Sequence, residues 1–172
     1  MSQSGGGGDN VTPVIIPAPT RIPRLFRIRD GDSEDLKAEG MVTTTGKVLV
    51  AALDLVSDYS PMFWQYDSLD SLNKESQLIT HNVIEFYDEM PSIVLSRITD
   101  KPRAFFLYRE HDLIGISGEG VIVEGLLTSN GNVSCCWLGP MASTFQHPCL
   151  KNLLALQCNP KTGITRFEYF KE

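Results

Sequence analysis

The clearest hydrophobic pattern in this chain lies in residues 46–59 and has the period of a helix. At about 100° per residue, its apolar side chains fall on one broad arc, and Lys47, Asp54 and Asp58 form a narrow polar stripe on the opposite side. The polar and apolar residues do not alternate as they would in a half-buried strand. A preceding threonine can cap the first turn, and Pro61 ends the segment. The pattern therefore predicts an amphipathic helix over 46–59 that packs on a sheet.

Other stretches have the alternation or the apolar runs that are typical of strands. The expected strands are Leu25–Arg29, Gln77–Phe86, Arg103–Arg109 and one beginning at Leu113–Ile116. Within Gln77–Phe86, His81 is interpreted as a half-buried strand residue rather than a catalytic one.

The strongest hairpin signal is in residues 121–138. Asn130-Gly131 supplies the two residues that a type I′ turn needs at positive φ, between two apolar arms. With a two-residue loop, Leu126 would face Cys135 and Glu124 would face Trp137. Because both arms are apolar on both faces, we expect this pair in the middle of the sheet, under the helix.

The C-terminal part predicts a short helix and a closing hairpin. Pro148 limits the helix to the later half of 143–156, and the hairpin joins Leu154–Cys158 to Ile164–Phe170. We recognise no internal repeat. Together the patterns predict an α+β fold, with an antiparallel sheet of about five strands packed against two or three helices.

The chain divides into a tail, residues 1–24, and a single globular domain, residues 25–172. The tail is rich in glycine and proline, which favour flexible or extended backbone over helix. Val14, Ile15 and Ile16 form an apolar spot within it. Because disordered tails seldom carry such residues, we expect this extended segment to dock, either on its own domain or on a neighbour.

Four arginines, Arg21, Arg24, Arg27 and Arg29, lie close together where the domain begins. One interpretation is an edge strand with a solvated face. The other is a cationic strip for the phosphates of RNA or of lipid headgroups, which arginine binds through its fork of donors. The acidic segment 30–39 weakens the second interpretation, because it lowers the local positive potential.

Composition narrows the classes of function. A net charge of −6 argues against a protein that binds nucleic acid over its whole surface, and no apolar run is long enough to span a bilayer. The N-terminus has no secretory signal, so the four cysteines are expected to be reduced thiols in the cytosol.

No catalytic, cofactor or metal site is predicted. Cys135, Cys136, Cys149, Cys158 and His147 lack the spacing of a zinc site, and the adjacent cysteines of a strand point to opposite faces. The glycines of 115–120 form neither a nucleophile elbow nor a dinucleotide loop. A Cys–His hydrolase stays open in principle, but the chain is interpreted as a non-enzymatic protein.

The order of these elements resembles that of the rhabdovirus matrix proteins, especially the short ones of plant cytorhabdoviruses. Four stretches carry the resemblance: MVTTTGKVLVAALDLVSDYSPMF, EMPSIVLS, EGVIVEGLLTSNGNVSCCWLGPM and LLALQCNPKTGITRFEYFKE. They are similar to the first strand–helix unit, the apolar loop, the central strands and the closing hairpin of that family, and they span about residues 40–172.

The resemblance implies a structural protein of the virion, beneath the envelope and in the host cytoplasm, which acts in assembly and budding. Such a protein self-associates, condenses the helical nucleocapsid and links it to the glycoprotein tail and the inner membrane leaflet. Carried over to this chain, Ile93, Val94 and Leu95 would receive a neighbour's tail at Val14–Ile16. On the pattern alone, Ile93–Leu95 is equally well one more core strand. The lysine-rich N-terminus of the family's animal-virus members is missing here, so membrane contact would depend on the four arginines.

Two other classes remain open. One is a β-rich coat or spike subunit of another virus, which is favoured if residues 46–59 form a strand. The other is a cytosolic interaction adaptor, which is favoured if the protein stays monomeric and ignores nucleocapsids.

Overall fold

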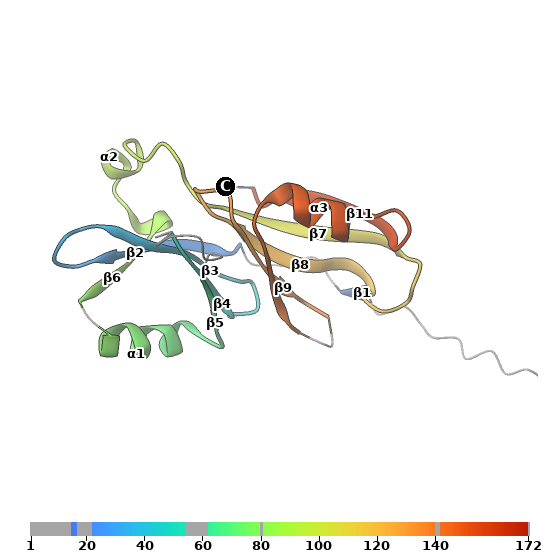
Figure 1. Cartoon of the computed structure of the whole chain (residues 1–172), viewed down its shortest axis with the longest axis horizontal. Coiled ribbons are helices and arrows are strands. Elements are labelled where there is room, and N and C mark those ends of the chain that lie inside the picture. The colour runs from blue at the N-terminus through green and yellow to red at the C-terminus, as the bar shows by residue number, and fades with distance from the viewer. Residues whose placement is uncertain (1–14, 17–21, 54–61, 80, 140–141, 172) are drawn as a thin grey trace, which may run out of the picture.

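The computed structural model describes residues 15–16, 22–53, 62–79, 81–139 and 142–171. These residues form two consecutive units with the same order of elements, four strands, a helix and a fifth strand (Figure 1). Unit 1 consists of β2 (Arg24–Asp30), β3 (Leu36–Val42), β4 (Val48–Ala52), β5 (Phe63–Tyr66), α1 (Leu69–Ile79) and β6 (Asn82–Phe86). Unit 2 consists of β7 (Arg103–Asp112), β8 (Glu119–Leu127), β9 (Val133–Trp137), β10 (Thr144–His147), α3 (Leu150–Gln157) and β11 (Gly163–Tyr169). The 3₁₀ turn η1 (Tyr87–Glu89) and the short helix α2 (Ser92–Leu95) join the units.

Each unit forms one antiparallel sheet, and the two sheets have the same topology. The strand order is β5-β4-β3-β2-β6 in unit 1 and β10-β9-β8-β7-β11 in unit 2. Every strand of unit 1 therefore has a counterpart at the same place in unit 2. A further strand, β1 (Ile15–Ile16), pairs with β8 in parallel.

Sequence identities at equivalent positions support an internal duplication. Glu39-Gly40 in β3 corresponds to Glu124-Gly125 in β8, and Thr43, Gly46 and Val48 correspond to Thr128, Gly131 and Val133. The prediction that the chain has no internal repeat is therefore wrong. The repeat is hard to see in the sequence because the identities cluster around one hairpin and the connecting loops differ in length.

The two sheets pack face to face, and one helix covers each outer face. Met41 and Leu49 of unit 1 share a buried cluster with Ala104, Leu126 and Cys136 of unit 2. On the outer face of the first sheet, Leu72 of α1 packs in a second cluster. On the outer face of the second sheet, Leu153 of α3 packs in a third. The expectation of one sheet against helices is corrected to two sheets between two helices, within the α+β class.

The predicted helix over 46–59 is wrong in its described part, because residues 48–52 form β4. All five residues of this strand are buried. Leu49 and Ala51 face the other sheet, and Val48 and Val50 face the layer of α1. A strand that is buried on both faces carries no polar residue to alternate, so its sequence can imitate the apolar arc of a helix. Residues 54–61 lie outside the described part.

Most other predicted elements exist, with shifted boundaries. Leu25–Arg29 and Arg103–Arg109 are confirmed within β2 and β7. The predicted strand Gln77–Phe86 is correct only from Asn82 on, because α1 extends to Ile79. His81 is exposed between the two elements, where its carbonyl oxygen accepts a 2.7 Å hydrogen bond from the Gly31 amide.

The hairpin of residues 121–138 is confirmed, but its predicted register is wrong by one residue. The Thr128 amide donates to the carbonyl oxygen of Asn132, so the turn is longer than two residues. Leu126 therefore pairs with Ser134, and Glu124 pairs with Cys136. Each turn residue added between two arms shifts the pairing across them.

The later half of 143–156 contains α3 as predicted, but α3 extends to Gln157. The expected first arm of the closing hairpin is thus mostly helical. Its second arm is β11, which pairs with β7 instead. Residues 113–116 form a loop rather than the beginning of a strand.

Candidate functional site

The tail strand β1 lies on an open stretch of β8. Ile15 pairs with Glu119 and Ile16 with Gly120. On its other side, β8 is paired with β7 from Gly120 onward, and β9 reaches only as far as Val123. The first residues of β8 therefore have a free edge where β9 has ended, and β1 lies there. Val14 lies outside the described residues.

An ordered apolar loop precedes this edge. Leu113, Ile114 and Ile116 are 66%, 52% and 73% exposed, although their side chains are large and hydrophobic. The carboxylate of Asp112 holds the loop by accepting hydrogen bonds from the backbone amides of residues 114, 115, 117 and 118. Partial burial opposes ionisation, but these four amides lower the pKa of Asp112 below its usual range.

The expected receiving loop at Ile93–Leu95 is the short helix α2, so the interpretation of these residues as a core strand is wrong. Ile93 is 63% exposed, whereas Leu95 lines a groove between the units. The structure does not bring Val14, Ile15 and Ile16 together with Ile93, Val94 and Leu95. Figure 1 shows β1 and α2 at opposite ends of the molecule.

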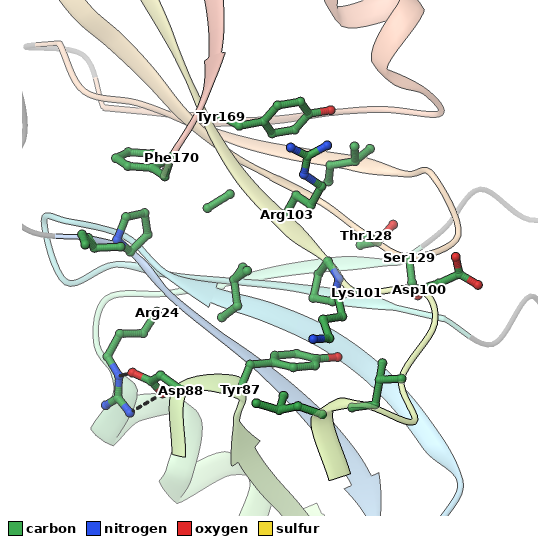
Figure 2. A pocket seen from close by; sticks show the side chains of 18 of the residues that line it. Arg24, Tyr87, Asp88, Asp100, Lys101, Arg103, Thr128, Ser129, Tyr169 and Phe170 are labelled. Carbon is green, nitrogen blue, oxygen red and sulfur yellow. Dashed lines mark hydrogen bonds and ion pairs between the residues drawn. The ribbon is translucent and has the colours of Figure 1, made fainter. Parts of the chain in front are cut away.

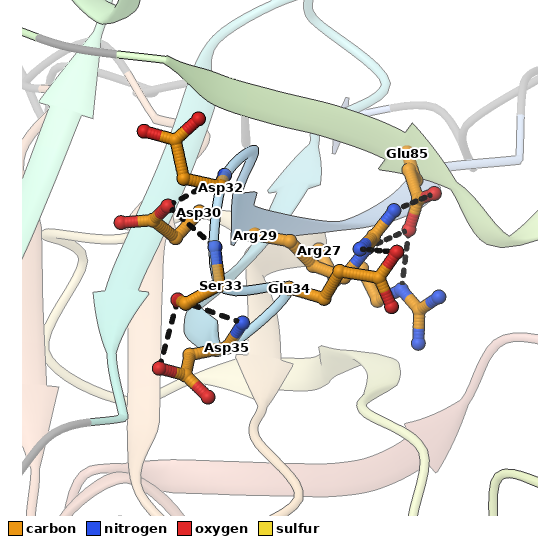
Figure 3. A network of polar contacts seen from close by, with 8 residues as sticks. All are labelled: Arg27, Arg29, Asp30, Asp32, Ser33, Glu34, Asp35 and Glu85. Atoms are coloured by element: carbon orange, nitrogen blue, oxygen red, sulfur yellow. Dashed lines mark hydrogen bonds and ion pairs between the residues drawn. The ribbon is translucent and has the colours of Figure 1, made fainter.

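The arginine strip is paired with carboxylates of its own chain (Figure 3). Arg27 and Arg29 both donate to the carboxylate of Glu85 on the neighbouring strand β6, each at 2.7 Å. The hydrogen bond from Arg29, with the help of Arg27, lowers the pKa of Glu85 to about 2. Arg21 lies outside the described residues. Because β2 lies between β3 and β6, the strip is not an edge strand as one interpretation supposed.

The acidic segment after β2 is only a small part of this neutralisation. The Asp30 carboxylate accepts from the amides of Asp32 and Ser33 and so closes its own turn (Figure 3). Glu34 reaches Arg29 only at 4.0 Å. The sequence correctly indicated that carboxylates neutralise the arginines. The principal carboxylate is that of Glu85, however, which is distant in sequence.

A groove lies between the two units, with a volume of about 1470 Å³ (Figure 2). The first residues of β2 and β7, the turn η1, the end of β11, the connection between the units and the β8–β9 turn all contribute to it. Its lining includes Leu95, Ile98 and Phe170 as apolar residues and Thr128 and Ser129 as hydroxyl residues.

Two equivalent arginines lie in the groove, one from each unit. Arg24 and Arg103 both begin the strand that starts their unit. Arg24 lies over the ring of Phe86 at 3.9 Å, and Arg103 lies over Tyr169 at 3.3 Å. The two rings are equivalent, because Phe86 pairs with Phe26 as Tyr169 pairs with Phe105.

The two arginines differ in their ion pairs. Arg24 donates to Asp88 at 2.7 Å and to Glu89 at 2.6 Å, and the hydrogen bond that Asp88 accepts is the main reason that the pKa of Arg24 is raised. Across the described residues, no carboxylate lies within ion-pair distance of Arg103. Sequence reasoning named Arg24 and missed Arg103. Recognition of the repeat would have shown their equivalence.

The cysteines are placed as the strand pattern predicted. Cys135 and Cys136 point to opposite faces of β9, toward different buried clusters. Burial raises the pKa of both thiols, so neither is an activated nucleophile. Within the described part of the chain, no three His, Cys, Asp or Glu side chains gather as metal ligands would. That the thiols are reduced and metal-free in solution stays a prediction.

Comparisons with known proteins address only part of the chain. None of the helices in the described ranges has the length and apolarity needed to cross a bilayer. No curated protein and no solved structure matches the sequence. Residues 102–171, which are unit 2 with its flanks, match the model of a family described as Acb5 phage protein.

Proposed function

We propose that this protein is a non-enzymatic, self-associating structural subunit of a virus, and that β1 joins subunits by pairing with β8 of a neighbouring copy. The observation that carries the proposal is the place of β1. It is a two-residue parallel strand on an open strand edge, and residues 17–21 connect it to the folded units. The similarity of unit 2 to a phage family supports a viral origin.

The edge of β8 can pair with β1 of its own chain or with β1 of a neighbouring copy. A strand that pairs within one chain can pair identically with a second copy, which is the principle of strand exchange. The exposed Leu113, Ile114 and Ile116 lie just before this edge and would lose contact with water in such an assembly. A two-residue strand buries far less than the roughly 1,200–2,000 Å² of a stable interface, so each contact is weak and many are needed.

Among the viral structural proteins considered, strand β4 favours a β-rich coat or spike subunit. The resemblance to rhabdovirus matrix proteins began with a strand–helix unit that includes residues 46–59, and residues 48–52 are a strand. The second candidate is a matrix protein, which would condense a nucleocapsid and link it to a glycoprotein tail and the inner membrane leaflet. It is supported by the sequence similarity of the central strands, which form the β8–β9 hairpin.

A cysteine pair at the β1–β8 register tests the exchange. Ile15→Cys with Glu119→Cys places two thiols on paired residues. Under oxidation we expect covalent dimers and longer ladders whose share grows with protein concentration. Ile15→Cys alone is the control for crosslinking through the native cysteines. Disulfides that form only within single chains at every concentration would contradict strand exchange.

Electron microscopy separates the two viral candidates. A coat or spike subunit should form regular assemblies by itself, whereas a matrix protein should assemble only with ribonucleoprotein. A protein without residues 1–20 should do neither, while its melting temperature stays nearly unchanged. If sedimentation shows that the shortened chain assembles as well as the full chain, the tail has no role in assembly.

A further inference from the structure

The two ends of the groove are built on equivalent positions that carry different charges. In unit 1 these positions hold Ile22, Arg24 and Asp88, and the arginine is neutralised by the aspartate. The counterparts in unit 2 are Lys101, Arg103 and Lys171. A neutral set in one unit thus corresponds to three cations in the other.

None of the three cations has a carboxylate partner among the described residues of the chain. All three line the groove, together with Asp100, whose carboxylate also forms no ion pair there. The protein as a whole is acidic, with a net charge of −6. An unpaired group of cations on an acidic protein, inside a concave site, is the arrangement that concentrates small anions.

We propose that this groove binds a small, elongated organic phosphate through Lys101, Arg103 and Lys171. Figure 2 shows Lys101 directed toward Tyr87 and Arg103 directed toward Tyr169, on different sides of the groove. Because these two side chains point to different sides of the groove, the ligand that we propose carries negative charge at two separated points. The groove volume of about 1470 Å³ also exceeds what a single inorganic phosphate needs.

The rest of the lining suits the organic part of such a ligand. Leu95, Ile98 and Phe170 supply apolar surface, and Thr128 and Tyr87 bring hydroxyl groups. Burial raises the pKa of Tyr87, so its hydroxyl stays protonated and can donate to an oxyanion. Arg103 lies over the ring of Tyr169 and forms no ion pair among the described residues, so its guanidinium can donate hydrogen bonds to a phosphate.

A compact anion fits this site better than a long nucleic acid. The positive charge is confined to one groove, and a polymer would have to continue over a surface that is acidic on average. At physiological ionic strength the favourable field extends only about 8 Å. Only a few phosphates of a polymer would therefore gain, and the others would be repelled.

The difference between the units supplies the test. Lys171→Asp gives Arg103 the partner that Arg24 has in unit 1, and Lys151→Glu makes the same change of charge on the exposed surface of α3. The probe is inorganic tripolyphosphate, titrated calorimetrically into the full chain at low and physiological salt. We expect binding by the wild type and by Lys151→Glu, and at least a tenfold loss for Lys171→Asp and for Arg103→Gln.

The reverse substitution should add affinity. Asp88→Lys gives unit 1 two of the three cations of unit 2 and removes one of the two carboxylate partners of Arg24, so tripolyphosphate should bind severalfold more tightly. Melting temperatures in the absence of probe show whether each variant is folded. The proposal is overturned if the wild type does not bind at millimolar probe, or if Lys151→Glu loses as much affinity as Lys171→Asp. It is also overturned if single-stranded DNA binds more tightly than tripolyphosphate.

Discussion

Glu39 and Glu124 occupy equivalent positions in the two units, and each buried carboxylate accepts a hydrogen bond from the hairpin turn of the opposite unit. The Ser129 amide donates to Glu39 at 2.7 Å, and the Thr44 amide donates to Glu124 at 2.8 Å. The Thr44 hydroxyl also donates to Glu124. Thr44 and Ser129 are themselves equivalent, because each is the second residue of its turn. The two units are therefore joined by a reciprocal pair of contacts.

These carboxylates make stability depend on pH. Burial raises the pKa of both, and the hydrogen bonds oppose the shift only in part. A group whose pKa is raised by folding contributes stability that is complete below its unfolded pKa and is lost as the pH rises through its folded pKa. The free energy of unfolding should thus decrease above about pH 4.5, the ordinary pKa of glutamate.

The double variant Glu39→Gln with Glu124→Gln should remove this decrease, because glutamine keeps an acceptor oxygen but does not ionise. Urea denaturation at a series of pH values measures the slope, with Glu89→Gln as an exposed control. A slope that is the same in the double variant and the wild type would exclude these two groups as its source.

A second pair of equivalent contacts constrains two glycines. The ring of Phe26 lies on Gly40, and the ring of Phe105 lies on Gly125. A Cβ at either glycine would lie 2.1 Å from the phenylalanine Cζ. Because both rings are fully buried, they have no room to move. Gly40→Ala and Gly125→Ala should each lower the free energy of unfolding by about 1–3 kcal/mol, as overpacking does.

Gly139→Ala is the matched control for these substitutions. Its nearest neighbour would be the carbonyl oxygen of Ser117 at 4.0 Å, so we expect almost no change. Chemical denaturation of the three variants makes the comparison. Equal stability of Gly125→Ala and Gly139→Ala would show that the Phe105 ring does not restrict this position.

The ion-pair cluster at Glu85 predicts the opposite dependence on pH. Arg29 and Arg27 lower the pKa of Glu85 to about 2. The stability that this shift contributes is present above the unfolded pKa of about 4.5 and is lost as the pH falls toward 2. Glu85→Gln should cost roughly 1–3 kcal/mol at neutral pH, since it leaves the partly buried Arg27 without a charged partner and Arg29 with only Glu34 at 4.0 Å. The variant should also lose less stability than the wild type as the pH falls from about 4.5 toward 2. Thermal melts between neutral and acid pH test this, and an equal loss in both proteins would refute it.

The sequence could predict strands that have one buried and one exposed face, and hairpins with a recognisable turn. Strand β2 and the β8–β9 hairpin were recognisable because alternation and Asn130-Gly131 are local signals. Strand β4 was not, because both of its faces are buried and the partner that buries Leu49 and Ala51 is another sheet. Helix α1 was not recognised as a whole, and its last residues fall in the stretch that predicted the strand Gln77–Phe86. Its polar sequence has only Leu72 fully buried among the side chains described.

The groove was beyond local patterns for a different reason. Arg103 and Lys171 are far apart in sequence, and only the pairing of β7 with β11 brings these segments together. Their importance follows from comparison with Arg24 and Asp88, which requires the repeat to be recognised first. The four arginines form a cluster in the sequence, which suggested a cationic strip, but Glu85 neutralises two of them.

Cleavage between the units tests whether they depend on each other. The connection at Ser96, Arg97, Thr99 and Asp100 is exposed, so a protease site inserted there should be cut without disturbing either sheet. The shared cluster between the sheets belongs to both units, and each unit alone would expose it to water. The two fragments should therefore elute together at the mass of the intact chain, 19.1 kDa. Leu126→Ala, in the shared cluster, should make the cut protein dissociate more readily, whereas Leu156→Ala, which is 61% exposed on α3, should not. Two fragments that separate into folded, independent monomers would show that each unit is a complete domain.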